Sequence, residues 1–275
     1  MTISAGIDVG SSGVKTAIFR VEGDQETLLA GRIDRILRRN PMVVGEESYN
    51  AALDSAGVSP EEVDYVATTG EGDLLEFRRG HFYTMTTHAR GARYLMPEAR
   101  AALDVGALHA RAIHMDDRSK VLNYRMTSQC ASGSGQFLEN IARYLGVTLE
   151  EVGTLSLEAD TSETISGICA VLAETDVINF VSRGIPAGNI LRGIHESMAS
   201  RYVRLLKSAK AEGQVAITGG LSRDPGLVGA LNRAATDQKL DLEIIPHPDG
   251  VMAGAFGAAL WGAWRHEYLL TQASA

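Results

Sequence analysis

Two cysteines, Cys130 and Cys169, are the only thiols among the 275 residues, and each stands where a helical pattern begins. Cys130 lies in TSQCASGSGQFLENIARYL and Cys169 in SGICAVLAETDVINFVSRGIP. The partial positive charge at a helix N-terminus would stabilise a thiolate or an anionic cluster there. A 4Fe-4S cluster usually needs four thiolates, so two suffice only if a second subunit contributes another pair. The alternative, which composition alone favours, is that both are small buried hydrophobic residues.

A glycine- and serine-rich turn near the N-terminus could bind phosphate. In DVGSSGVK, close approach to a phosphate is expected of the backbone at Gly10, Ser11, Ser12, Gly13 and Val14. Asp8 could hold a water molecule of a bound Mg²⁺, and Lys15 could add positive charge near the phosphates. The alternative is an ordinary β-hairpin turn. The chain lacks the G-x-x-x-x-G-K-[ST] pattern of a P-loop.

Two later turns extend this pattern. DVGALHAR repeats the acidic start with Asp104 and Gly106, and a basic residue follows at the same spacing as in the first turn. This faint repeat predicts two similarly built halves. ITGGLSRD places Gly219 and Gly220 where the backbone could approach a base or ribose, although it could equally be a plain strand-to-helix turn. Strands that alternate with helices predict an α/β architecture.

Composition and charge exclude several function classes. The net charge is −8 and the basic residues form no long run, so we expect no nucleic acid and no membrane as a partner. The longest apolar run, residues 251–264, is too short to span a bilayer, and its small residues predict a helix packed closely on a neighbour. The N-terminus shows no export signal, so we expect a cytoplasmic protein with reduced thiols.

The order of the three turns resembles the superfamily of sugar kinases, Hsp70-type chaperones and actin. That resemblance implies two related actin/Hsp70-like (ribonuclease H-like) α/β halves that close over a nucleotide. It implies ATP or ADP and Mg²⁺ as cofactors, with catalytic roles for Asp8 and Asp104. We expect residues 1–102 plus 250–275 to form the first half, and residues 103–249, with both cysteines, the second.

Three segments resemble a narrower family, the activators of 2-hydroxyacyl-CoA dehydratases and the ATP-binding subunits of benzoyl-CoA reductase. They are CASGSGQFLE, CAVLAETDVI and THARGARYLMPEA. In that family a 4Fe-4S cluster lies between two subunits, so the resemblance assigns Cys130 and Cys169 as its metal ligands, completed by the partner's equivalent pair. It also implies that ATP hydrolysis drives an electron from the cluster to a second protein.

The second phosphate turn departs from the family pattern. Asp-Ile-Gly-Gly-Gln-Asp is usual, whereas here Ala107, Leu108 and His109 follow the glycine, which leaves open whether this subunit hydrolyses ATP. This departure, together with TTGEGD at 68–73, resembles the D-type subunits. The resemblance implies a related A-type ATP-binding subunit as heterodimer partner, a benzoyl-CoA-binding subunit pair, and ferredoxin as electron donor.

Three alternatives stay open. The chain could be a homodimeric activator of a 2-hydroxyacyl-CoA dehydratase, which would purify as one chain type. It could be a small-molecule kinase of the same fold without iron. It could also be a non-catalytic ATP-binding interaction protein whose cysteines are structural.

Overall fold

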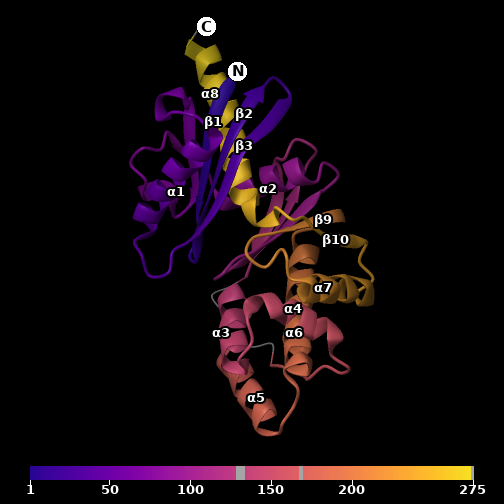
Figure 1. Cartoon of the computed structure of the whole chain (residues 1–275). Helices are drawn as coiled ribbons and strands as arrows, with labels where there is room; N and C mark the ends of the chain where they lie inside the picture. Colours follow the sequence, from indigo (N-terminus) through magenta and orange to yellow (C-terminus); the bar gives the residue numbers. More distant parts are fainter. Residues whose placement is uncertain (128–133, 167–169, 274–275) are drawn as a thin grey trace. The chain divides into compact units, whose positions relative to one another are not determined.

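The computed structural model describes residues 1–127, 134–166 and 170–273, so the expected cluster ligands Cys130 and Cys169 lie outside the described residues. The chain contains two five-stranded mixed sheets with helices, which confirms the predicted α/β class (Figure 1). Across the described residues, no helix is both long enough and apolar enough to cross a membrane.

The two sheets share one topology. The first has the strand order β3-β2-β1-β4-β5 and the second the order β8-β7-β6-β9-β10. In each, the central strand pairs antiparallel with the strand that follows it and parallel with a strand from later in the chain. The first sheet consists of β1 (Thr2–Val9), β2 (Gly13–Glu22), β3 (Gln25–Arg35), β4 (Tyr65–Gly70) and β5 (Gly80–His81). The second consists of β6 (Ala101–Val105), β7 (Ala110–Met115), β8 (Val121–Met126), β9 (Gly213–Thr218) and β10 (Leu242–Pro246).

The chain divides into two compact units. The first comprises Met1–Pro97, Arg118–Lys120 and Met252–Ala275, and the second Glu98–Asp117 and Val121–Val251. The expected boundary after residue 102 falls inside β6, whose five residues all belong to the second sheet. The structural boundary therefore lies earlier, between Pro97 and Glu98.

In the first unit, helices cover β1 on both faces. Ile3, Ala5 and Ile7 share a hydrophobic cluster with residues of α1 (Pro41–Ala56), while Ser4 donates to the carbonyl of Ala259 in α8 (Ala253–Ala273). Such alternation follows from the period of two along a strand. The helix α2 (Thr84–Leu95) packs on α8 (Figure 1), as the small residues of 251–264 predict.

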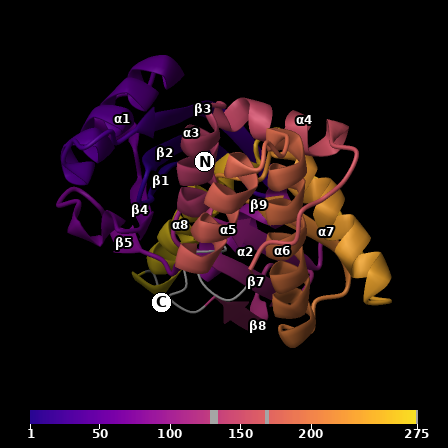
Figure 2. The ribbon, with the colours of Figure 1, turned by 90° about the horizontal axis from the view of Figure 1, so that it is seen from below.

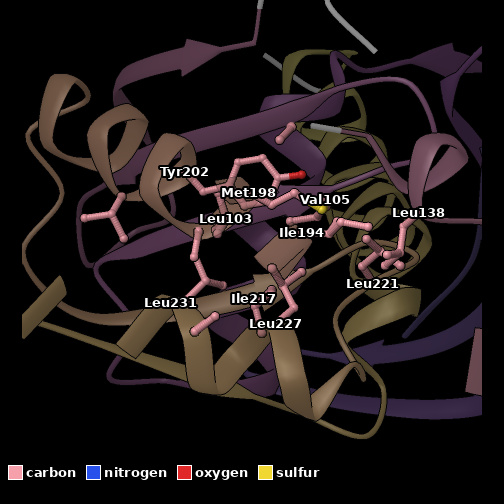
Figure 3. Close-up of a cluster of buried hydrophobic side chains, with 14 of the residues drawn as sticks. Leu103, Val105, Leu138, Ile194, Met198, Tyr202, Ile217, Leu221, Leu227 and Leu231 are labelled. Atoms are coloured by element: carbon pink, nitrogen blue, oxygen red, sulfur yellow. The ribbon is translucent and has the colours of Figure 1, made fainter. Parts of the chain in front are cut away.

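The second unit has its own core. Its helices are α3 (Gly135–Leu145), α4 (Leu149–Glu158), α5 (Ala170–Ser182), α6 (Ala187–Ser208) and α7 (Pro225–Asp237). Figure 2 shows α6 between α5 and α7, and both helices contact it. The core residues labelled in Figure 3 are Leu103 and Val105 of β6, Ile217 of β9, Leu138 of α3, Ile194, Met198 and Tyr202 of α6, Leu221, and Leu227 and Leu231 of α7.

Candidate nucleotide-binding site

The first hairpin turn connects β1 to β2, as its sequence predicts. Gly10 donates its N–H to the carbonyl of Gly13 at 3.0 Å. Asp8 and Lys15 face each other across the two strands, with 3.8 Å between Oδ2 and Nζ. A Cβ on Gly10 would lie 3.2 Å from Lys15 Nζ, so glycine here leaves space beside the ammonium group. The exposed turn therefore places open backbone beside the largely buried ammonium group of Lys15, which fits a phosphate.

The second hairpin turn repeats this geometry between β6 and β7. Gly106 donates to the carbonyl of His109 at 2.9 Å, as Gly10 does to Gly13. Asp104 faces Arg111 in register, and their ion pair is short, with 2.8 Å between Oδ2 and Nη1. The predicted internal repeat is thus confirmed. The two copies differ in that Arg111 holds the second carboxylate closely.

A glycine with positive φ lies beside each of these carboxylates. Gly70 ends β4 with φ +68, and a Cβ there would lie 3.1 Å from Oδ1 of Asp8. Gly219 follows β9 with φ +84, and its Cβ would lie 2.5 Å from Oδ1 of Asp104. Only glycine adopts such a φ without strain, and at both positions it also avoids placing a side chain against the carboxylate. We predicted Gly219 from sequence but not Gly70, although Thr-Gly ends the neighbouring parallel strand in both halves.

His88 and Gly254 complete the surroundings of Asp8. A Cβ on Gly254 would lie 2.8 Å from Oδ2 of Asp8 and 2.9 Å from Nε2 of His88. The carboxylate and the imidazole therefore both lie next to Gly254. His88 is 3% exposed and Asp8 is 7% exposed. Neither His88 nor Gly254 was predicted as a site residue. The available signal for His88 was its place in THARGARYLMPEA.

The third turn is held by hydrogen bonds to the second hairpin and to a distant glycine. Gly219 donates to the carbonyl of Gly250 at 3.2 Å, and Leu221 donates to the carbonyl of Val105 at 3.3 Å. A Cβ on Gly220 would meet no described atom within 4 Å, so the space above this residue is open. The backbone can accordingly approach a flat group such as a base or ribose at Gly220.

The described residues on both sides of positions 128–133, which include Cys130, are hydrogen-bonded to the second hairpin. On one side, Thr127 donates its N–H to the carbonyl of Ala110 at 2.9 Å. On the other, α3 begins at Gly135, and the N–H groups of Gly135 and Gln136 donate to the carbonyls of Gly106 and Ala107 at 3.0 and 2.9 Å. The first N–H groups of a helix have no partner within it, and here the second hairpin turn supplies two acceptors.

The segment before Cys169 is attached to α5 and α6. Ser166 donates its N–H to Oδ2 of Asp176 in α5 at 2.8 Å. Glu163 donates its N–H to the carbonyl of Asn189 in α6 at 3.2 Å. Within the described part of the chain, no three His, Cys, Asp or Glu residues gather closely enough to hold a metal ion.

Comparison with known proteins places this chain in a family. A sequence model of the BadF/BadG/BcrA/BcrD ATPase family matches residues 5–262. The D-type subunit of the benzoyl-CoA reductase of Thauera aromatica is 63% identical over 270 residues, which are 98% of this chain and 96% of that protein.

Solved structures agree with this placement. Component A of the (R)-2-hydroxyglutaryl-CoA dehydratase of Acidaminococcus fermentans superposes with a TM-score of 0.87 at 27% identity, covering 97% of this chain and 100% of its own. The activator of the 2-hydroxyisocaproyl-CoA dehydratase of Clostridium difficile, with bound ADPNP, gives 0.85 at 26% identity and covers 98% of both chains. A ROK hexokinase of Thermus thermophilus, 15% identical with a TM-score of 0.53 over 98% of this chain and 100% of its own, shares the fold alone.

Proposed function

Because the chain belongs to the BadF/BadG/BcrA/BcrD ATPase family, we propose that it is the D-type ATP-binding and ATP-hydrolysing electron-transfer subunit of a benzoyl-CoA reductase. The identity of 63% to a D-type subunit supports this choice over a dehydratase activator. Reduced ferredoxin is the proposed electron donor, a related A-type subunit the proposed partner, and a benzoyl-CoA-binding subunit pair the proposed acceptor.

One observation supports the coupling of ATP to electron transfer most directly. The second hairpin gives the carbonyls of Gly106 and Ala107 in its turn, and of Ala110 at the start of β7, to the residues on both sides of the Cys130 segment. A phosphate that alters this turn would therefore move both attachments of that segment together. A sugar kinase has no need to connect its phosphate turn to a cysteine-bearing segment in this way.

Different residues of this chain are proposed to contact different parts of the nucleotide. Asp8 is proposed to hold a water of the Mg²⁺ ion, because a side chain at position 70 or 254 would crowd its carboxylate oxygens and glycine at both positions avoids this. Lys15 is proposed to contact phosphate, since Gly10 leaves space beside its ammonium group. The backbone at Gly219 and Gly220 is proposed to receive the adenosine.

The thiols of Cys130 and Cys169 are proposed to ligate a 4Fe-4S cluster together with the partner's equivalent thiols. When bound, the cluster supplies one-electron transfer at low potential. Lowering the potential of an electron by roughly 300 mV costs about 7 kcal/mol, which explains why such a protein needs ATP. The free energy of ATP hydrolysis is proposed to act through the second hairpin turn, which is bonded to residues beside the Cys130 segment.

Anaerobic co-purification with the candidate partner subunits tests this proposal. We expect two related ATP-binding chains, bound iron, and the visible absorbance of an iron–sulfur cluster that Cys130→Ser abolishes. Asp8→Asn is the matched control, and it should keep the iron while losing ATP hydrolysis. A single chain type with iron would favour the dehydratase activator. An iron-free protein that phosphorylates a small molecule would refute the redox function.

A further inference from the structure

A polar network is buried in the core of the second unit. His195 of α6 is 0% exposed and contacts a residue from each of two other helices. Its Nδ1 lies 2.9 Å from Oγ of Ser156 in α4, and its Nε2 lies 3.2 Å from Oδ2 of Asp224. Asp224 is the N-cap of α7, where its Oδ1 accepts the N–H of Leu227 at 3.0 Å.

Glycines enclose this network from both sides. A Cβ on Gly153 would lie 2.7 Å from Oδ1 of Asp224, and a Cβ on Gly226 would lie 2.7 Å from Nδ1 of His195. The backbones of α4 and α7 therefore press directly on the polar atoms. A small shift of Asp224 must displace His195, because closely packed groups leave no space for independent movement.

The order of the three groups resembles that of a hydrolase triad, but the burial excludes that role. Ser156 is 3% exposed and His195 is completely buried, so no substrate reaches either of them. The network can therefore act only through the position of the helices that it joins.

Those helices connect the third turn to the segment before Cys169. Asp224 follows Gly219 and Gly220, the proposed adenosine site, in the segment between β9 and α7. On α6, two residues before His195, Gly193 contacts the carbonyl oxygen of Glu163 so closely that any side chain would collide with it. The first half of α6 thus contacts both Asp224, which follows the third turn, and Glu163, which lies in the segment before Cys169.

We infer that His195 is a positioning residue through which α6 links occupancy of the adenosine turn to the segment leading into Cys169. This inference rests on the proposed function, because it requires a nucleotide at Gly219 and Gly220. It adds a second connection to the one between the phosphate turn and the Cys130 segment. Each cysteine segment would then respond to a different part of the nucleotide.

The experiment uses the full chain, with ADP as the probe, and measures ADP affinity by calorimetry and amide exchange of residues 161–166. In the wild type, we expect ADP to slow exchange at Ser166, whose N–H is bonded to Asp176. His195→Leu should weaken ADP binding about tenfold and abolish the ADP-dependent protection. His195→Gln, which keeps a polar amide near the position of the imidazole Nε2, should restore most of both effects.

Met198→Ala is the matched control, because Met198 is equally buried on α6 and contacts the same core. It should lower stability while keeping the ADP affinity within about twofold and the protection intact. If His195→Leu does not fold, Ser156→Ala tests the same link, with an expected loss of affinity of about threefold. A wild type that fails to bind ADP would refute the proposed function, and the inference with it. Equal behaviour of the His195 (or Ser156) variants and Met198→Ala would overturn the inference alone.

Discussion

The ion pair between Arg111 and Asp104 should stabilise the chain more than its counterpart between Lys15 and Asp8. Arg111 Nη1 lies 2.8 Å from the carboxylate, and the Asp104 side chain is 4% exposed. Lys15 Nζ lies 3.8 Å from Asp8, beyond hydrogen-bonding distance, although both side chains of that pair are also largely buried. Replacing each base by glutamine removes the positive charge while keeping much of the side-chain stem.

The expected costs follow from burial and distance. Removing one partner of a buried, hydrogen-bonded pair costs about 3–5 kcal/mol, and we expect the lower end, about 3 kcal/mol, because Arg111 is 22% exposed. Lys15→Gln should cost about 1 kcal/mol, because no hydrogen bond to Asp8 is lost. In a chain of this size each kcal/mol lowers the melting temperature by about 2–4 °C, so we expect decreases of about 6–12 °C and about 2–4 °C.

A double-mutant cycle separates the pair from other effects of the substitution. Asp104→Asn combined with Arg111→Gln removes both charges of this pair, whereas Arg111→Gln alone leaves the buried carboxylate of Asp104 without its cation. The double variant should therefore be more stable than Arg111→Gln. The assay is thermal unfolding followed by circular dichroism. Equal melting temperatures for Arg111→Gln and Lys15→Gln, or a double variant no more stable than Arg111→Gln, would show that the short contact does not stabilise the second hairpin.

Two further predictions concern packing and pH. Gly257→Ala should destabilise the chain by about 2 kcal/mol, because its Cβ would collide with the carbonyl of Thr87. Gly220→Ala adds a Cβ in open space, so it should change the free energy of unfolding by less than about 0.5 kcal/mol. Urea titrations measure both changes. Burial would raise the pKa of Asp224, but the contact with His195 and the hydrogen bonds from backbone N–H groups outweigh burial and hold that pKa below its usual value. The stabilisation that ionised Asp224 contributes is therefore complete above about pH 5 and is lost as the pH falls below about 4. Asp224→Asn should make the free energy of unfolding less dependent on pH in this range. An unchanged pH dependence in the variant would contradict this prediction.

Local patterns in the sequence predicted the turns, whereas long-range packing decided what surrounds them. The hairpin at Asp8 and its repeat at Asp104 were predictable because all of their residues are close in sequence. Gly254 and His88 reach Asp8 from distant helices, and no local pattern reports such a meeting. The boundary within β6 was missed for the same reason, since strand pairing with β9 decides where that strand belongs.

The network around His195 shows a second limit of sequence reasoning. Ser156 lies in α4, His195 lies in α6 and Asp224 is the N-cap of α7, and each is unremarkable in its own segment. A buried histidine on an apolar helical face reads as a core residue. Only the close approach of the helix backbones, made possible by Gly153 and Gly226, brings the three polar groups together.

The departure from the usual second phosphate motif affects side chains but spares the attachment of α3. Gly135 and Gln136 donate to the backbone carbonyls of Gly106 and Ala107, which every residue type provides. Ala107, Leu108 and His109 in place of the Gly, Gln and Asp of that pattern therefore remove an amide and a carboxylate from the turn without removing an acceptor from the helix. The substitution changes the chemistry available at the second turn, while its connection to the Cys130 segment depends only on the backbone.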